Sequence, residues 1–169
     1  MKPLPHLYTV RAVGAGSGAL DLQSEGAPPL PSAAPAEFGG PGDLWSPETL
    51  LVGAVADCFI LTFRAVARAG KLEWLRLECA TEGTLARVDG TTCFTRFASH
   101  ATLTVPPGTD AAKAKDLLAW TMREVQTQVM ATLPEDVTVD ERARLERGFA
   151  AAIALPASGG VPVVDRDVL

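Results

Sequence analysis

The sequence predicts an α+β fold in which an antiparallel sheet packs on a long, buried central helix. Residues 45–70 form an almost wholly apolar segment with helix start and stop signals. A run that alternates apolar and polar residues is followed by Asp89-Gly90, a strong hairpin signal, and by a returning strand. A second helical pattern follows the hairpin instead of separating its strands, which favours helices grouped against an antiparallel sheet.

Length and composition predict one soluble globular domain that covers residues 1–169. Hydrophobic residues make up 47% of the chain and charged residues 21%, both ordinary values for a soluble protein. The net charge of −5, without a basic cluster, argues against a nucleic-acid-binding function. The first residues, MKPLPHLYTV, do not contain the apolar stretch of a secretory signal.

The cysteines and histidines do not follow the spacing of a disulfide framework or a metal site. Cys58, Cys79 and Cys93 are odd in number and widely separated. His6 and His100 have no Cys/His partner at the spacing of metal ligands. We therefore expect a reducing cytoplasm as the location, and neither a metal nor another cofactor.

The N-terminal part predicts a strand pair followed by a long connection. Leu7–Val13 is rich in β-branched and aromatic residues, and Ala19–Gln23 returns after a glycine-rich turn. The turn GAGSG lacks the strand-to-helix context and the ending of a phosphate-binding loop. Gly26–Gly42 is rich in proline and glycine, which predicts a structureless segment placed to wall a pocket or cross to a partner chain.

The central helix is predicted from its first residues and its apolar content. Ser46 stands at the N-cap, Pro47 at the first helical position and Glu48 in the first turn, where a negative charge is favourable. From residue 50 to residue 66 nearly all side chains are apolar or small, which predicts burial on all sides. Asp57 and Arg64 interrupt this run, so we do not expect a membrane span.

A helix that is apolar on all sides needs more cover than one small sheet provides. A second copy of the chain is the simplest cover. We therefore expect a two-fold homodimer in which the central helices of the two copies pack together.

The second half of the chain predicts a long hairpin and a second helix. Leu72–Ala86 alternates apolar and polar residues, and Thr91–Val105 returns after the Asp-Gly turn. Ala111–Leu133 has apolar residues at helical spacing and follows a Thr-Asp cap. Three remaining segments are interpreted as a short strand, a terminal helix and a tail without a clear pattern: Val137–Val139, Glu141–Leu155 and Pro156–Leu169.

Cys58 lies in the middle of the central helix, between Asp57 and Phe59, and its thiol has two interpretations. It can be a packing residue, because free cysteine is among the most buried residue types. It can also be a catalytic thiolate in a pocket with apolar walls. Composition alone favours packing for Cys58. The same holds for Cys79 and Cys93, each of which lies inside a predicted strand.

The segment Ser46–Phe59, SPETLLVGAVADCF, resembles the Pro-Glu-x-Leu…Ala-x-Cys-Phe helix of the OsmC/Ohr family, the osmotically inducible and organic hydroperoxide resistance proteins. The order of a Tyr-Thr strand pair, a Gly/Pro-rich loop, the helix, a long hairpin, a second helix and a Val-Thr-Val strand is also similar. The resemblance covers about residues 7–140 and leaves residues 141–169, the predicted C-terminal helix and tail, unmatched.

This resemblance implies the OsmC-like fold, an intertwined homodimer with two helices buried between curved sheets. It also implies that Cys58 is a site residue, because peroxidatic members reduce organic hydroperoxides with a cysteine at this position. A glutamate that matches Glu48 assists in those members. Glu48 and Cys58 are ten positions apart, about 15 Å along one straight helix. Contact therefore requires a later helix start, a bend near Gly53, or a pocket built with loops or the other subunit.

The chain departs from the peroxidatic pattern at two places. Those relatives carry a second cysteine in the second helix, whereas here the segment reads VQTQVMATL and the position falls near Thr127. They also carry an arginine in the first hairpin, where this chain has Gly16 or Ser17. Arg11, on the preceding strand, is the nearest substitute. Asp57, directly before the cysteine, would oppose a thiolate by like-charge repulsion if it lies close.

Two hypotheses follow, and a purely structural or assembly role has less support. The first is a thiol-dependent peroxidase for organic hydroperoxides, with Cys58 as nucleophile, Glu48 and Arg11 assisting, and an external thiol as reductant. The second is a non-catalytic protein that binds a small hydrophobic ligand in an apolar pocket around Cys58, Phe59 and Phe63. A solvent-accessible Cys58 beside a cation would favour the first.

Overall fold

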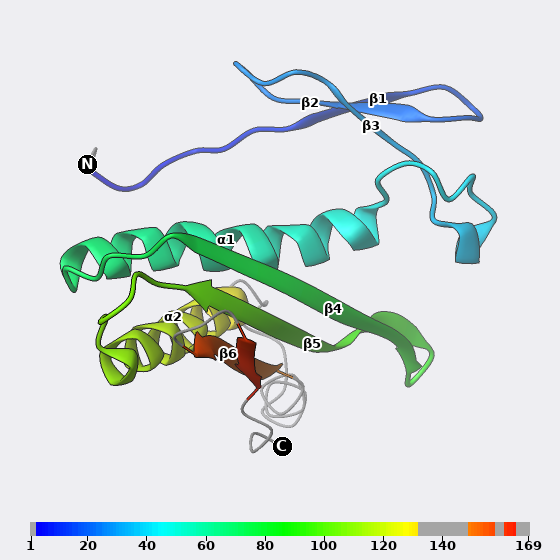
Figure 1. The fold of residues 1–169 in the computed structure, drawn as a ribbon. Helices are drawn as coiled ribbons and strands as arrows, with labels where there is room; N and C mark the ends of the chain where they lie inside the picture. Colours follow the sequence, from blue (N-terminus) through cyan, green and yellow to red (C-terminus); the bar gives the residue numbers. More distant parts are fainter. Residues whose placement is uncertain (1–2, 132–148, 158–160, 165–169) are drawn as a thin grey trace. The chain divides into compact units, whose positions relative to one another are not determined.

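The computed structural model describes residues 3–131, 149–157 and 161–164. The chain divides into two compact units, residues 1–51 and residues 52–169, and each is described by itself. Figure 1 shows the elements coloured along the sequence. The assignment of all 169 residues to one domain stays a prediction.

The first unit contains a small antiparallel sheet with the strand order β1-β2-β3. Its strands are β1 (Arg11–Gly14), β2 (Leu20–Gln23) and β3 (Leu30–Ser32). The predicted strand pair is present, although β1 begins only at Arg11. β2 lies within its expected range, and β1 ends one residue beyond its own, at Gly14.

The prediction of a structureless segment over Gly26–Gly42 is wrong in two places. The segment contains β3 and a short 3-10 helix, η1 (Ala36–Phe38). β3 is an edge strand that pairs only with β2 in its sheet. An edge strand tolerates Pro31 because a backbone N–H on its open side would have no neighbouring strand to bond. A proline-rich segment therefore still contains a strand, β3, that pairs with β2.

The central helix, α1 (Pro47–Ala69), begins and ends close to the predicted bounds. The N-cap is reciprocal: the Thr49 N–H donates to Ser46 Oγ at 3.2 Å, and the Ser46 N–H donates to Thr49 Oγ1 at 2.8 Å. These two bonds satisfy backbone donors that a helix start otherwise leaves unpaired. The cap explains why the helix starts where the sequence indicates.

One stripe of α1 is buried in the single chain. Val55, Phe59, Phe63 and Ala67 recur every four residues and face the core, whereas Leu61 is half exposed. By length and composition α1 is also a candidate membrane span, but core helices of soluble proteins pass the same test. Its apolar surface therefore exceeds what the rest of the described chain covers.

The second unit is built on the predicted hairpin. β4 (Arg76–Val88) and β5 (Thr91–Thr104) pair in antiparallel register along almost their whole length. Asp89 and Gly90 both have positive φ angles, 49° and 84°, as a two-residue turn between such strands requires. The Asp-Gly prediction is confirmed.

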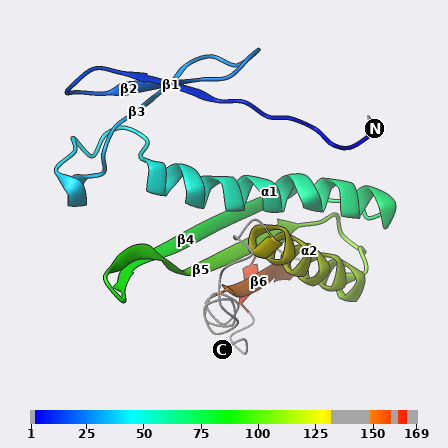
Figure 2. The same ribbon diagram turned by 180° about the vertical axis from the view of Figure 1, so that it is seen from behind.

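The second helix, α2 (Ala111–Ala131), packs into the same core. Asp110 caps it by accepting a hydrogen bond from the Lys113 N–H at 3.1 Å, as predicted. Figures 1 and 2 show α2 against the sheet. The buried core combines residues of α1, β4, β5 and α2, among them Phe59, Phe63, Leu103, Leu118 and Val125.

The prediction of a terminal helix is wrong over residues 149–155. There the chain forms β6 (Phe149–Ala157), which runs parallel to β5, and β7 (Val161–Val164) then pairs antiparallel to β6. Pairing with the open edge of β5 outweighs the helix propensity of the alanine-rich segment. The predicted strand Val137–Val139 and residues 141–148 lie outside the described residues.

Candidate functional site

Cys58 lies in the middle of α1 and is half-buried. It precedes Phe59, which belongs to the buried hydrophobic core, and its own partly buried side chain packs against that core. All three cysteines are free. The helix therefore holds the thiol on a rigid element, at the margin between the core and the surface.

Polar groups from both helices contact the Cys58 sulfur. Thr62 Oγ1, one turn further along α1, lies 3.8 Å from Sγ, and either atom can donate. On α2, Gln128 Oε1 accepts the thiol proton at an Sγ–Oε1 distance of 3.5 Å. The Gln128 Nε2 group in turn donates to Glu124 Oε1 at 3.1 Å. A hydrogen-bonded series thus runs from Cys58 through Gln128 to Glu124.

Gln128 was not identified from the sequence. Thr127, which sequence reasoning placed where relatives have a second cysteine, donates its hydroxyl to the Arg123 carbonyl of its own helix at 2.9 Å. The helical period offered a signal, because Gln128 follows the core residue Val125 by three positions; its side chain is exposed but reaches the thiol. Resemblance alone could not say which of two adjacent side chains faces the thiol.

Cys79 and Cys93 lie on β4 and β5, as predicted. Burial raises the pKa of the Cys79 thiol, and a hydrogen bond from Thr81, at a Sγ–Oγ1 distance of 3.8 Å, opposes this shift. A raised pKa lowers the thiolate fraction at neutral pH, and the thiolate is the reactive form. Cys79 is therefore a less suitable nucleophile than an ordinary exposed cysteine.

The structure places the other two predicted site residues in the first unit. Glu48 lies in the first turn of α1, and its Oε2 atom is buried without a hydrogen-bond partner in the described part of the chain. Arg11 lies on β1 with its side chain exposed. Within the described residues the two form neither a hydrogen bond nor an ion pair. Their roles stay predictions.

A later start of the helix does not bring Glu48 to Cys58. α1 begins at Pro47 and continues to Ala69, so that both residues belong to one helix. Ten residues of an α-helix rise about 15 Å, which is far beyond the reach of a hydrogen bond. The other two explanations, a bend near Gly53 and a pocket completed by loops or by a second copy, stay predictions.

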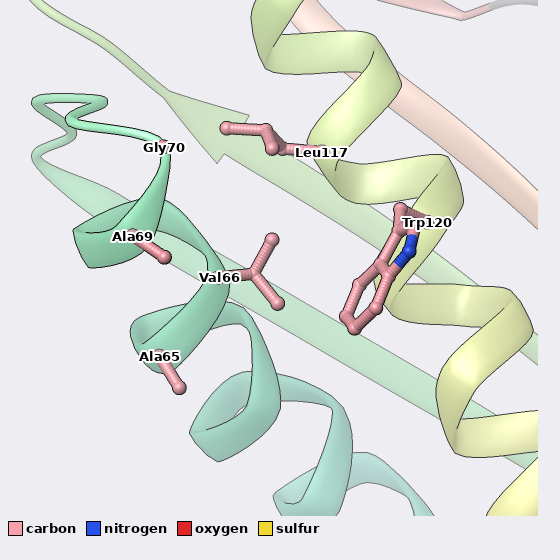
Figure 3. Close-up of a pocket in the computed structure, with 6 residues that line it drawn as sticks. All are labelled: Ala65, Val66, Ala69, Gly70, Leu117 and Trp120. Carbon is pink, nitrogen blue, oxygen red and sulfur yellow. The ribbon is translucent and has the colours of Figure 1, made fainter.

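An open apolar pocket of about 430 Å³ lies between the C-terminal part of α1 and α2, away from Cys58. Figure 3 shows the Val66, Leu117 and Trp120 side chains in the space between the two helices. The aromatic residues of the expected ligand pocket, Phe59 and Phe63, are instead buried in the core. The pocket is lined by six residues: Ala65, Val66, Ala69, Gly70, Leu117 and Trp120.

The described fold is an α+β arrangement of two α-helices, an antiparallel three-stranded sheet and a mostly antiparallel four-stranded sheet, with a half-buried thiol on the central helix. A model of the OsmC-like protein family matches residues 40–142, more than half of the chain, and this range includes both helices and the hairpin. The chain belongs to the OsmC-like protein family. The resemblance drawn from residues 46–59 is thereby confirmed.

Solved structures show the same fold at low sequence identity. An OsmC-like protein from Mycoplasma pneumoniae is 14% identical, with a TM-score of 0.69 over 90% of this chain and 99% of that one. An organic hydroperoxide resistance protein from Legionella pneumophila is 20% identical, with a TM-score of 0.62 over 92% and 100%. A putative organic hydroperoxide resistance protein from Vibrio cholerae, with captopril bound in one of its active sites, is 16% identical, with a TM-score of 0.61 over 91% and 95%.

The solved structures confirm the predicted fold class. A comparison with curated proteins finds no significant match.

Proposed function

We propose that this OsmC-like protein is a thiol-dependent peroxidase that reduces organic hydroperoxides through Cys58 alone and is regenerated by an external thiol. The observation that carries the proposal is the free, half-buried Cys58 on α1, which faces Gln128 of α2 and not a second thiol. Family membership and two neighbours described as organic hydroperoxide resistance proteins support the substrate class.

The chemistry requires one proton and two equivalents of external thiol. The Cys58 thiolate attacks the terminal oxygen of the hydroperoxide, so that an S–O bond forms and the O–O bond breaks. The alkoxide that leaves takes up a proton and becomes an alcohol. The products are a sulfenic acid on Cys58 and the alcohol. One external thiol then condenses with the sulfenic acid to a mixed disulfide and water. A second external thiol reduces this disulfide, which restores Cys58.

Glu48 and Arg11 are proposed to assist this reaction as the resemblance implies. The buried Glu48 oxygen without a partner is an acceptor that a hydroperoxide O–H or a guanidinium could satisfy. Arg11 carries a cation on an exposed side chain of β1, which leaves it available for such a pairing. A cation beside the sulfur would stabilise the thiolate over the thiol.

A homodimer is proposed as the working form. α1 is apolar on faces that the described chain leaves exposed, with Leu61 at 50% exposure, and a second copy would cover them. Light scattering coupled to size exclusion at micromolar concentration should give twice the mass of the 17.7 kDa chain. A mass of one chain over the whole concentration range would contradict the dimer.

The alternative is a non-catalytic protein that binds a small hydrophobic ligand. The apolar pocket between α1 and α2 favours it, because about 430 Å³ lies within the range of small-molecule sites. In that case Cys58 would be a packing residue, and its reaction with hydroperoxides would be no faster than that of a free thiol.

Single-turnover oxidation distinguishes these functions. Protein in which Cys79 and Cys93 are replaced by serine is mixed with cumene hydroperoxide, and loss of the remaining thiol is followed in time, with sulfenic acid trapped by dimedone. We expect rapid oxidation that is abolished in Cys58→Ser and slowed about tenfold or more in Glu48→Gln, because a charge-assisted hydrogen bond is lost.

Controls make the result specific. Hydrogen peroxide in place of cumene hydroperoxide tests the preference for organic substrates, and glutathione as the free thiol sets the uncatalysed rate. Oxidation of Cys58 at the glutathione rate would rule out the peroxidase and direct attention to ligand binding in the apolar pocket.

A further inference from the structure

The Glu124 carboxylate decides which end of the Gln128 amide faces Cys58. A carboxylate accepts hydrogen bonds and does not donate them, so that the group 3.1 Å from Glu124 Oε1 must be the amide NH₂. The amide oxygen then faces the sulfur at 3.5 Å. Since this oxygen can only accept, the sulfur must be the donor and carry its proton. Both hydrogen bonds lie at the exposed surface, and among the protein groups of this network the pairing is complete for the thiol and mismatched for the thiolate.

We propose that Gln128 is a positioning residue that holds Cys58 in a protonated resting state, and that Glu124 sets its orientation. The proposal rests on the proposed function, in which Cys58 must lose this proton before it attacks. A thiolate would face the amide oxygen, and two acceptors repel. Turning the amide would give the sulfur an N–H donor, but it would also point the oxygen at the Glu124 carboxylate.

The contacts of the sulfur from both helices support this account. From α1, the Thr62 hydroxyl at 3.8 Å is able to donate to a thiolate. The adjacent Asp57 is exposed and carries a negative charge, which does not favour a second one on the sulfur. From α2, the charged group in the network is Glu124, through Gln128. The contacts of Cys58 with Gln128 and its neighbour Asp57 thus favour the thiol, and Thr62 can donate to a thiolate.

The test is the rate at which iodoacetamide alkylates Cys58 in the full chain, measured by mass spectrometry of the Cys58 peptide between about pH 6 and pH 10. In Glu124→Gln the new side chain can accept or donate, so the Gln128 amide is free to turn its N–H groups to the sulfur. We expect alkylation about three- to tenfold faster than in wild type near neutral pH. At high pH the rates should converge, because the thiol is then ionised in both proteins.

Two further variants make the test specific. Asp116→Asn removes the same charge from α2 twelve residues before Gln128, about 18 Å along the helix, and should leave the rate unchanged. Gln128→Glu places an acceptor-only group at the sulfur and should slow alkylation near neutral pH. Circular dichroism of each variant checks that the fold is retained.

A Glu124→Gln rate equal to wild type at every pH would overturn the proposal. A rate raised by the same factor at every pH would do so too, because it would report easier access to the sulfur and not a changed protonation. The test uses no hydroperoxide. A protein inert to cumene hydroperoxide that still shows the pH-dependent effect would refute the peroxidase and retain the network.

Discussion

Replacing Phe63 with alanine is expected to lower the free energy of unfolding by about 3–5 kcal/mol. Phe63 is fully buried, and its ring meets the Trp74 ring edge-on, with centroids 5.5 Å apart. The substitution removes apolar area from the core and leaves a cavity between α1 and the strands, which a rigid helix–sheet contact cannot close. Urea denaturation followed by circular dichroism, at one fixed protein concentration, measures the loss.

Two further substitutions control for residue type and size. Phe38→Ala makes the same change at a side chain that is 58% exposed, and it should cost less than about 0.5 kcal/mol. Phe63→Leu keeps most of the volume and should cost less than Phe63→Ala. Equal losses for Phe38→Ala and Phe63→Ala would contradict the assignment of Phe63 to the core.

The second large effect is expected at Gly83 of β4, where the Val52 side chain of α1 lies close to the strand. A Cβ atom at this position would lie 2.5 Å from Val52 Cγ2 and 2.6 Å from Phe94 Cε1. Real Cβ contacts are not this short, so Gly83→Ala must displace α1 or the aromatic pair of Phe94 and Phe97, whose stacked rings are 5.1 Å apart. We expect a loss of about 1–3 kcal/mol from overpacking.

Gly16→Ala is the matched control for this prediction. A Cβ at Gly16 would meet no atom within 4 Å, and its backbone is not in the left-handed region. This variant should be as stable as wild type or slightly more stable, because alanine reduces the freedom of the unfolded chain. If Gly83→Ala unfolds at the wild-type urea concentration, the close approach of α1 to β4 is wrong.

Core packing positions the residues of the proposed reaction. Cys58 is next to Phe59, which is buried on α1, so the packing of Phe59 holds the thiol in place. Gln128 is placed by the packing of Val125 and its neighbours on α2 in the same way. We therefore expect the two kinds of substitution to have separable effects. Glu124→Gln should change the reactivity of Cys58 without lowering the free energy of unfolding. Phe63→Ala should mainly lower the free energy of unfolding.

Local signals accounted for the parts of the fold that the sequence predicted correctly. The Ser46 cap with Pro47 after it defines the start of α1, because the cap satisfies helix donors within four residues. Asp89 and Gly90 define the hairpin turn, because they tolerate positive φ. Each of these signals acts over a few neighbouring residues and needs no tertiary partner.

The sequence by itself thus determined the α+β class, the central helix, the hairpin and the candidate thiol at Cys58. The tertiary structure decided the strand β6, which exists because β5 offers an open edge that outweighs helix propensity. It also decided that Gln128, and not Thr127, faces the thiol. Both outcomes depend on contacts between segments far apart in the chain, and the local pattern of residues does not specify which distant segments meet.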